Sequence, residues 1–238
     1  MVEDDEENFS LEYLVYSEEE REKWEVVMVL PGVEVIPELT FYICRNVKEV
    51  IMSDSVKRIE NEVFQECHSL VFVKLSRTLE YIGWWAFCIC TSLTSIFIPP
   101  SCGEIDGGAF SGCKKLIILG LPLHTQLGRY IFESTALMDS SPIETDFDVY
   151  DYDNEEAVQW VKSINNGEAN SLHRACSSFN PIVDIIHDLV KRQGIGSMRK
   201  KNVIGITPSQ YLEANTFADI SEKEIINRYI SEMLGVVF

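Results

Sequence analysis

The stretch that decides the fold is LTSIFIPPSCGEIDGGAFSGCKKL, which runs from Leu93 to Leu116. Its apolar side chains recur along the chain at a fixed interval of 23 residues, and a fifth copy is one residue shorter. Several independent columns in one register indicate an internal repeat rather than chance similarity. The columns are Phe41, Phe64, Phe87, Phe110 and Phe132; Cys44, Cys67, Cys90 and Cys113; Ile36, Ile59, Ile82, Ile105 and Leu127; and Val27, Val50, Val73, Ile96 and Leu119.

This period is typical of a solenoid, in which each unit forms one turn and buries its apolar side only against its neighbours. Within a unit, Val50-Ile51-Met52 alternates inward and outward like a short strand, and such strands pair in parallel about 4.8 Å apart. A second extended piece points Ile59 inward, and a tight segment presents Phe64 and Cys67. We therefore expect buried ladders of isoleucine, phenylalanine and cysteine.

The same residues carry a family resemblance. The unit Leu93–Leu116 resembles the BspA-like class of leucine-rich repeats, whose pattern is roughly L-x-x-I-x-I-P-x-S-V-x-x-I-G-x-x-A-F-x-x-C-x-x-L. The unit before it matches through Ile82-Gly83 and Ala86-Phe87, and the one before that has Val63 where alanine is usual. The resemblance implies a curved solenoid with a parallel sheet on its concave side, whose repeats serve binding and not chemistry.

Acidic residues divide the chain into four parts. It carries 20 Lys and Arg against 38 Asp and Glu, a net charge of −18. Most of the excess lies in residues 1–23 and 139–156, where like charges repel and extend the chain. We therefore predict an acidic leader over residues 1–23, a solenoid of about five units over 24–138, an acidic linker over 139–156 and a helical module over 157–238. This acidity argues against nucleic acid or a membrane surface as a partner.

The apolar spacing of the last part is that of helices, so the protein is α+β overall. Pro181 opens a helix that Gly194 ends, Thr207-Pro208 opens another, and Ser221 with Glu224 predicts a capping box.

This part also resembles a known repeat. Ser171–Ala175 resembles the T-P-L-H-x-A start of an ankyrin repeat, and Gly205 precedes a second Thr-Pro opening. The resemblance implies one and a half to two divergent ankyrin-like repeats in which His173 bonds turn backbone; a different helical cap is the alternative. The whole layout resembles leucine-rich-repeat proteins with this helical tail in unicellular eukaryotes, from which no activity transfers.

The sequence shows no pattern that indicates catalysis. Cys44 and its column are best interpreted as small apolar filler, and no cysteine or histidine spacing fits a zinc or redox site. Phosphate-loop, metalloprotease and nucleophile-elbow motifs are absent from the sequence. No secretory signal is visible at the N-terminus, which predicts a cytoplasmic location and reduced thiols. We expect no enzyme activity, no metal and no cofactor.

The function that we expect is that of a monomeric, non-enzymatic scaffold that binds a protein partner. Residues between the buried columns should lie on the concave sheet, and exposed apolar patches mark partner sites. The N-terminal leader or the helical module could instead cover this face. The candidate partner-binding residues are Met28, Ile51, Phe72, Lys74, Phe97 and Ile118.

Two other functions stay open. A cell-surface or adhesion-type repeat protein would need a secretory signal and oxidised cysteines. A thiol-dependent enzyme, the third option, would need at least one cysteine that reacts quickly near neutral pH.

Overall fold

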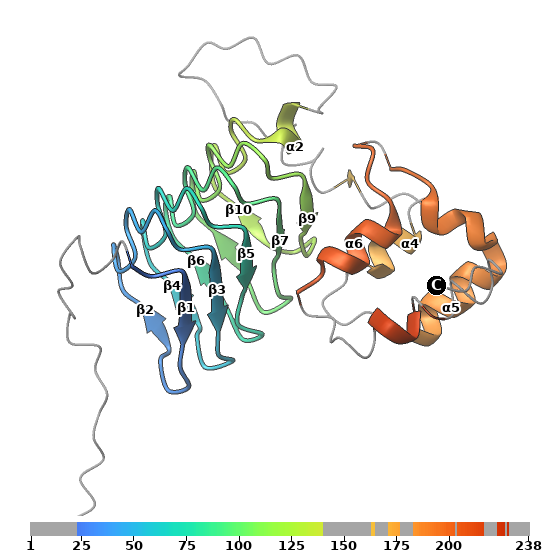
Figure 1. Ribbon diagram of the computed structural model, residues 1–238, viewed down its shortest axis with the longest axis horizontal. Helices are drawn as coiled ribbons and strands as arrows, with labels where there is room; N and C mark the ends of the chain where they lie inside the picture. The colour runs from blue at the N-terminus through green and yellow to red at the C-terminus, as the bar shows by residue number, and fades with distance from the viewer. Residues whose placement is uncertain are drawn as a thin grey trace, which may run out of the picture.

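The computed structural model describes residues 23–139, 163–164, 171–176, 183–202, 204–216, 223–226 and 228. Within these residues, short strands wind into a coil over the first part, and helices follow it in the second (Figure 1). The strand region confirms the prediction of a solenoid with parallel sheets. No helix of the described residues is long and apolar enough to cross a bilayer.

Each turn of the coil begins with a strand of three or four residues, and all but one of the neighbouring pairs of these strands are joined in parallel. The register follows the repeat, so that Val27 pairs with Val50 and Val50 with Val73. We call the outward surface of these strands the long-strand face. They are β1 (Val26–Val29), β3 (Glu49–Met52), β5 (Phe72–Lys74), β7 (Ser95–Phe97) and β9 (Ile118–Gly120).

The long strands do not form the single sheet that we expected. They form two sheets, one in the order β1-β3-β5 and one in the order β7-β9. The Ser53 N–H donates to the Val29 carbonyl at 3.0 Å, just beyond the first strand pair. Pro99 occupies the equivalent position after β7, and proline has no N–H to donate. One bond is therefore missing between the two sheets. Pro122 holds the same position after β9, yet β7 and β9 pair, so the proline alone does not account for the split.

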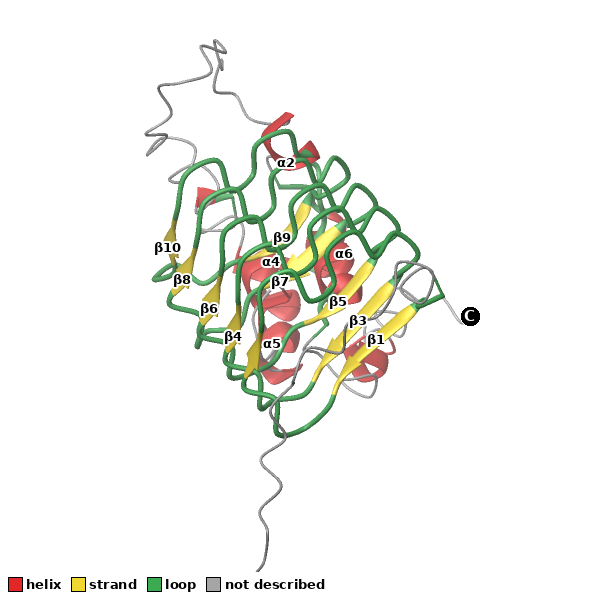
Figure 2. Ribbon diagram, turned by 90° about the vertical axis from the view of Figure 1, so that its left-hand side faces the viewer, coloured by secondary structure: helices red, strands yellow, loops and turns green. Residues whose placement is uncertain are grey.

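A second row of two-residue strands forms one continuous parallel sheet in the order β10-β8-β6-β4-β2 (Figure 2). Its register pairs the predicted isoleucine column, with Ile59 between Ile36 and Ile82. These side chains are buried, which confirms that the column points inward. The strands are β2 (Val35–Ile36), β4 (Arg58–Ile59), β6 (Tyr81–Ile82), β8 (Glu104–Ile105) and β10 (Gln126–Leu127).

A stack of phenylalanine rings runs through the core of the coil. Phe87 lies between Phe64 and Phe110 with ring centroids at 5.1 and 5.5 Å, and each pair is nearly parallel. Phe41 and Phe132 extend the stack at its two ends with centroid distances of 5.2 and 5.8 Å. The prediction that the matching phenylalanines lie on top of one another is confirmed.

The third side of the coil, between each short strand and the next long strand, has an unusual backbone. Two positions in each turn have positive φ, although most of these residues are not glycine. This conformation costs an L-residue roughly 1–2 kcal/mol. Hydrogen bonds to the next turn hold it, such as Trp85 N–H to the Gly107 carbonyl at 3.2 Å. The columns are Leu39, Glu62, Trp85, Gly108 and Tyr130, and Ile43, Glu66, Ile89, Gly112 and Ser134.

The helical part agrees with the predicted helix boundaries where it is described. One helix ends at Gln193, directly before Gly194. Another begins after Thr207, whose side chain forms a capping box with Gln210. Pro181 and Ser221 lie outside the described residues. The elements are α2 (Ala136–Asp139), α4 (Ser171–Cys176), α5 (Val183–Gln193), η2 (Ile195–Arg199) and α6 (Pro208–Ala214).

The helices lie at the end of the coil that carries the last long strands. Both views place α4 and α6 beside β7 and β9 (Figures 1 and 2). Buried residues of the coil and of the helices belong to one hydrophobic cluster. The two parts therefore share a core at this end.

Candidate functional site

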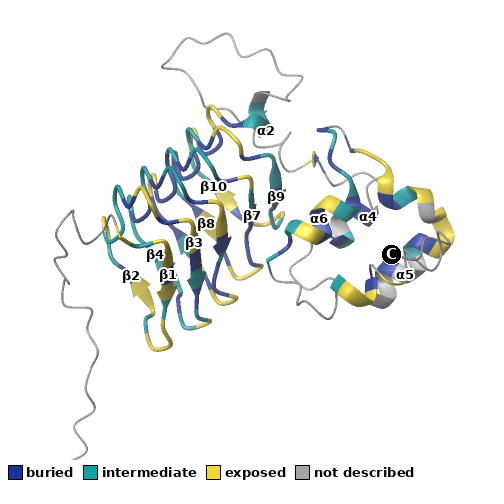
Figure 3. Cartoon of the chain, viewed as in Figure 1, coloured by how far each residue is buried: buried dark blue, intermediate teal, exposed yellow. Residues whose placement is uncertain are grey.

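The long-strand face is apolar and exposed at its β1 end. Along β1 the side chains alternate, with Val27 buried and Met28 65% exposed. On the neighbouring strands Phe72 is 39% exposed, while Ile51 and Lys74 are half-buried. Four of the predicted partner-binding residues thus lie on one surface, because the parallel register places them in adjacent rows (Figure 3).

The other end of the same face is covered. Phe97 is only 1% exposed, so the expectation that it lies on the open surface is wrong. Ile118, one strand further, is half-buried. Phe97 lies on β7, beside which the figures place α4 and α6, as expected if the helical module covers part of the face (Figures 1 and 2). The open surface is therefore restricted to β1, β3 and β5.

Charged residues border this open surface. The Lys48 ammonium lies 3.1 Å from the Glu25 carboxylate, and both side chains are more than half exposed. Exposed ion pairs of this kind contribute about 0–1 kcal/mol. Glu49, at the start of β3, is exposed as well. The arrangement of an apolar centre with a polar rim is typical of protein interfaces.

The cysteine column has a structural role. Each of Cys67, Cys90 and Cys113 donates its thiol to the carbonyl of the phenylalanine 26 residues earlier, at 3.1–3.3 Å. All seven cysteines are buried, and the structure places none of them in a disulfide. Burial raises the pKa of the Cys102 and Cys176 thiols to about 12. Within the described residues, no group of histidines, cysteines and carboxylates could hold a metal ion.

These thiols should react slowly in the native protein. A pKa raised from 9.0 to about 11 for Cys88, or to about 12 for Cys102, lowers the thiolate fraction at neutral pH. The decrease is about 100- to 1000-fold, because each pKa unit is a factor of ten. We expect iodoacetamide to label the folded chain slowly and all seven cysteines quickly in guanidinium without reductant. Fewer than seven labelled cysteines in guanidinium would favour the cell-surface alternative. One cysteine that is labelled quickly in the folded chain would favour the thiol-dependent enzyme.

His173 holds two helical segments together. Its Nε2 donates to the Ile206 carbonyl at 3.0 Å, and its ring meets Tyr211 edge-on with centroids at 6.2 Å. The side chain is buried, and this burial lowers the pKa of His173, which keeps the ring neutral at pH 7. The interpretation of His173 as a residue that bonds turn backbone is confirmed.

A polar cluster on the short strands was not expected from the sequence. The Arg58 guanidinium lies 4.0 Å from the centre of the Tyr81 ring and 2.9 Å from the Glu60 carboxylate. The Tyr81 hydroxyl donates to the Asp106 carboxylate, and burial together with this bond raises the pKa of Tyr81. These contacts link side chains of three neighbouring turns. Their signal in the sequence was that Arg58 and Tyr81 stand 23 residues apart.

The chain was compared with families, curated proteins and solved structures. The family described as "BspA type Leucine rich repeat region" matches residues 34–152 in six copies. No curated protein matches the chain.

Several solved structures match with partial coverage. A leucine rich cell surface protein from Faecalibacterium prausnitzii is 26% identical with a TM-score of 0.41, covering 45% of this chain and 32% of its own. A leucine rich repeat protein from T. pallidum is 28% identical with a TM-score of 0.46, covering 48% and 56%. One from Bacteroides capillosus is 30% identical with a TM-score of 0.37, covering 41% and 76%.

The match with the first two proteins spans about a third and just over half of their own lengths. The family match covers half of this chain and includes strands β2 to β10 of the coil. The chain therefore belongs to the family of BspA type leucine-rich repeat proteins.

Proposed function

We propose that the chain is a non-enzymatic scaffold that binds a protein partner on the open part of the long-strand face. The observation that carries this proposal is the exposure of large apolar side chains on a regular sheet. Val26, Met28 and Leu30 are each at least half exposed, and Phe72 lies two strands away. Isolated exposed apolar residues are ordinary on a surface, but a contiguous set marks an interaction site.

Two further features belong to this proposal. The reduced, buried cysteines favour a reducing compartment such as the cytoplasm, because extracellular proteins usually oxidise their thiols. The helical module is proposed to be ankyrin-like, supported by the His173–Ile206 bond and the Thr207-Pro208 helix start. In this arrangement the helical module covers the β7–β9 end of the long-strand face. The β1–β5 end stays available to a partner protein, and the chain itself acts as a monomer.

The test compares two matched variants in a quantitative pull-down. Met28→Glu/Phe72→Glu places charge on the open face, whereas Leu123→Glu changes a side chain that is 56% exposed and lies on a loop after β9. We expect proteins captured by the wild type to be retained by Leu123→Glu and reduced at least about tenfold by the double variant. That factor corresponds to about 1.4 kcal/mol.

Both variants should keep the wild-type circular dichroism, because surface substitutions usually change stability by about 0.5 kcal/mol or less. Phe97→Glu is avoided because it would bury a carboxylate. If the double variant captures the same proteins as the wild type, binding does not occur on this face.

A further inference from the structure

Two adjacent tryptophans are exposed on the third side of the coil. Trp84 and Trp85 are each 45% exposed, although only Gly83 separates them from strand β6, in which Ile82 is buried. Their ring centroids are 6.2 Å apart and the ring planes meet at 79°. The two indoles therefore form an open corner, which we call the tryptophan corner. A large aromatic side chain that stays half exposed is more informative than one that is buried.

The next turn supports this corner with two glycines. A Cβ on Gly107 would lie 2.6 Å from Cζ3 of Trp84, and one on Gly108 would lie 2.3 Å from Cδ1 of Trp85. One edge of each indole thus rests on bare backbone, and no other residue would fit beneath the rings. The glycines determine where the indoles lie, while the rest of each ring is exposed.

The preceding turn holds the corner from the other side. The Trp84 N–H donates to Oδ1 of Asn61 at 3.0 Å, and the Glu62 N–H donates to the Trp84 carbonyl at 2.8 Å. Trp85 itself has a φ of 52°, a conformation that a β-carbon disfavours. The corner is therefore held in place by its neighbours before any ligand binds. Such preorganisation lowers the cost of binding.

The surroundings of the corner are acidic. Glu62 occupies the same column as Trp85, one turn earlier. Near these residues, the pKa of the Cys88 thiol is raised to about 11, mainly by burial and in smaller part by neighbouring groups that include the carboxylates of Glu66, Glu133 and Glu62. Arg129 stands in the column of Trp84, two turns later, and has interactions of its own. Negative charge next to exposed indoles favours a cationic ligand and disfavours an anionic one.

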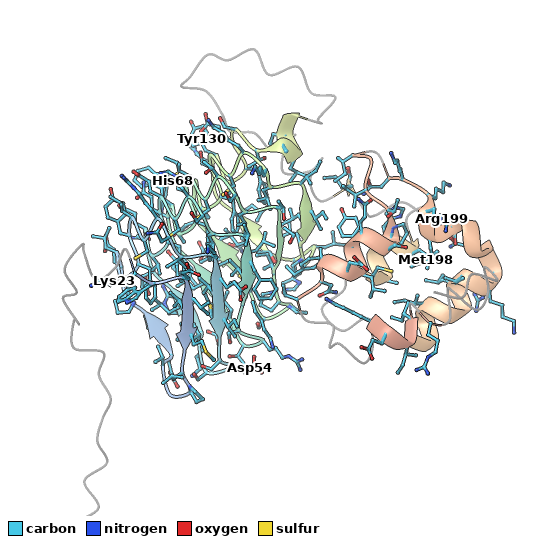
Figure 4. All side chains as sticks on the ribbon, in the orientation of Figure 1. Lys23, Asp54, His68, Tyr130, Met198 and Arg199 are labelled. Carbon is cyan, nitrogen blue, oxygen red and sulfur yellow. The ribbon has the colours of Figure 1, made fainter. Side chains whose placement is uncertain are left out.

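Tyr130 extends the aromatic surface along the coil. It follows Trp85 and Gly108 in the same column and is 37% exposed. Figure 4 shows Tyr130 and His68 on the edge of the coil opposite to Asp54. A ligand that lies along the column would meet Trp85 first, then the glycine, then Tyr130. This spacing suits an extended segment better than a single small cation.

We propose that the tryptophan corner binds an arginine-bearing segment of a partner protein. The planar guanidinium stacks on an indole face while its N–H groups donate to a carboxylate such as Glu62. Lysine fits less well, because its ammonium is compact, strongly hydrated and cannot stack. The corner lies on a different side of the coil from the long-strand face, so either site can fail without the other.

The test measures binding of a fluorescein-labelled peptide of alternating arginine and glycine, at physiological ionic strength, by anisotropy. The full chain is compared with Trp84→Ala/Trp85→Ala, which has the same net charge. We expect affinity to fall about tenfold in this variant, since two partly exposed cation–π contacts contribute about that much. Trp84→Phe/Trp85→Phe keeps aromatic faces and should keep most of the affinity, which separates lost contacts from lost folding.

Two matched controls isolate the site from the general acidity of the chain. Glu62→Gln and Glu49→Gln remove the same charge, and only the first should weaken binding several-fold. A peptide of alternating lysine and glycine should bind more weakly than the arginine peptide. The proposal is overturned if the arginine peptide does not bind the wild type, if the alanine variant binds equally well, or if the lysine peptide binds as tightly.

Discussion

Replacing Phe87 by alanine is expected to lower the free energy of unfolding by about 3–5 kcal/mol, the usual range when a buried aromatic ring is removed and a cavity is left in its place. The ring is fully buried and lies between Phe64 and Phe110 at 5.1 and 5.5 Å. The neighbouring rings cannot move in to fill the space, because each is attached to a turn whose strands pair in register. Urea unfolding followed by circular dichroism measures the change.

The position of Phe87 within the coil makes the loss larger than at an end. In a repeat protein each unit is stabilised by the units on both sides, so a central defect weakens two contacts between turns. Phe41 lies in the first turn and is half-buried. We therefore expect Phe41→Ala to lower the free energy of unfolding clearly less than Phe87→Ala does. Phe72→Ala, on the exposed face, should lower the free energy of unfolding by a still smaller amount. Equal effects at Phe41 and Phe87 would show that the stacked rings do not act as one core.

The sequence predicts those features of the fold that repeat. A column such as Ile36, Ile59 and Ile82 can be recognised because every turn faces the same environment, so each has the same residue. The strand register, the phenylalanine stack and the inward cysteines all follow from that interval. Helix boundaries at Gly194 and Thr207 were also predictable, because caps depend on local residue types.

Features that depend on contacts outside the repeat could not be predicted. Phe97 belongs to the same column as Met28 and Ile51, yet it is buried at the end of the coil where the helices lie. The split between β5 and β7 likewise arises in one turn only, because the other neighbouring long strands pair with one another. A repeat pattern describes an average turn, and these two positions depart from it.

The tryptophan corner was missed for a different reason. Trp84 and Trp85 occupy positions where the preceding turn carries Asn61 and Glu62, so they belong to none of the apolar columns that define the repeat. Their arrangement depends on Gly107 and Gly108, which follow one turn later. The available signal was two adjacent tryptophans followed by two adjacent glycines after one period of 23 residues. Pairs of large and small residues at the repeat interval can thus indicate surface sites.

Replacing Gly83 by alanine is expected to lower the free energy of unfolding by about 1–3 kcal/mol, the usual cost of forcing atoms into a packed interior. A Cβ at this position would lie 2.7 Å from the Glu60 carbonyl carbon and 2.8 Å from the Asn61 nitrogen. Both are backbone atoms and cannot rotate away. The Gly83 N–H also donates to the Ile59 carbonyl at 2.8 Å, which prevents the two turns from separating without losing that bond.

Gly103 provides the matched control, because it lies in the same coil and a Cβ there would meet nothing within 4 Å. Neither Gly83 nor Gly103 has a positive φ, so alanine is conformationally allowed at both and only the space differs. Gly103→Ala should leave stability unchanged or raise it by about 0.4–1 kcal/mol, since alanine restricts the unfolded chain. Thermal unfolding of the two variants side by side would measure the difference. If both behave alike, the close approach of successive turns at Gly83 does not limit which residue the position accepts, and the glycine of the family's I-G pattern needs another explanation.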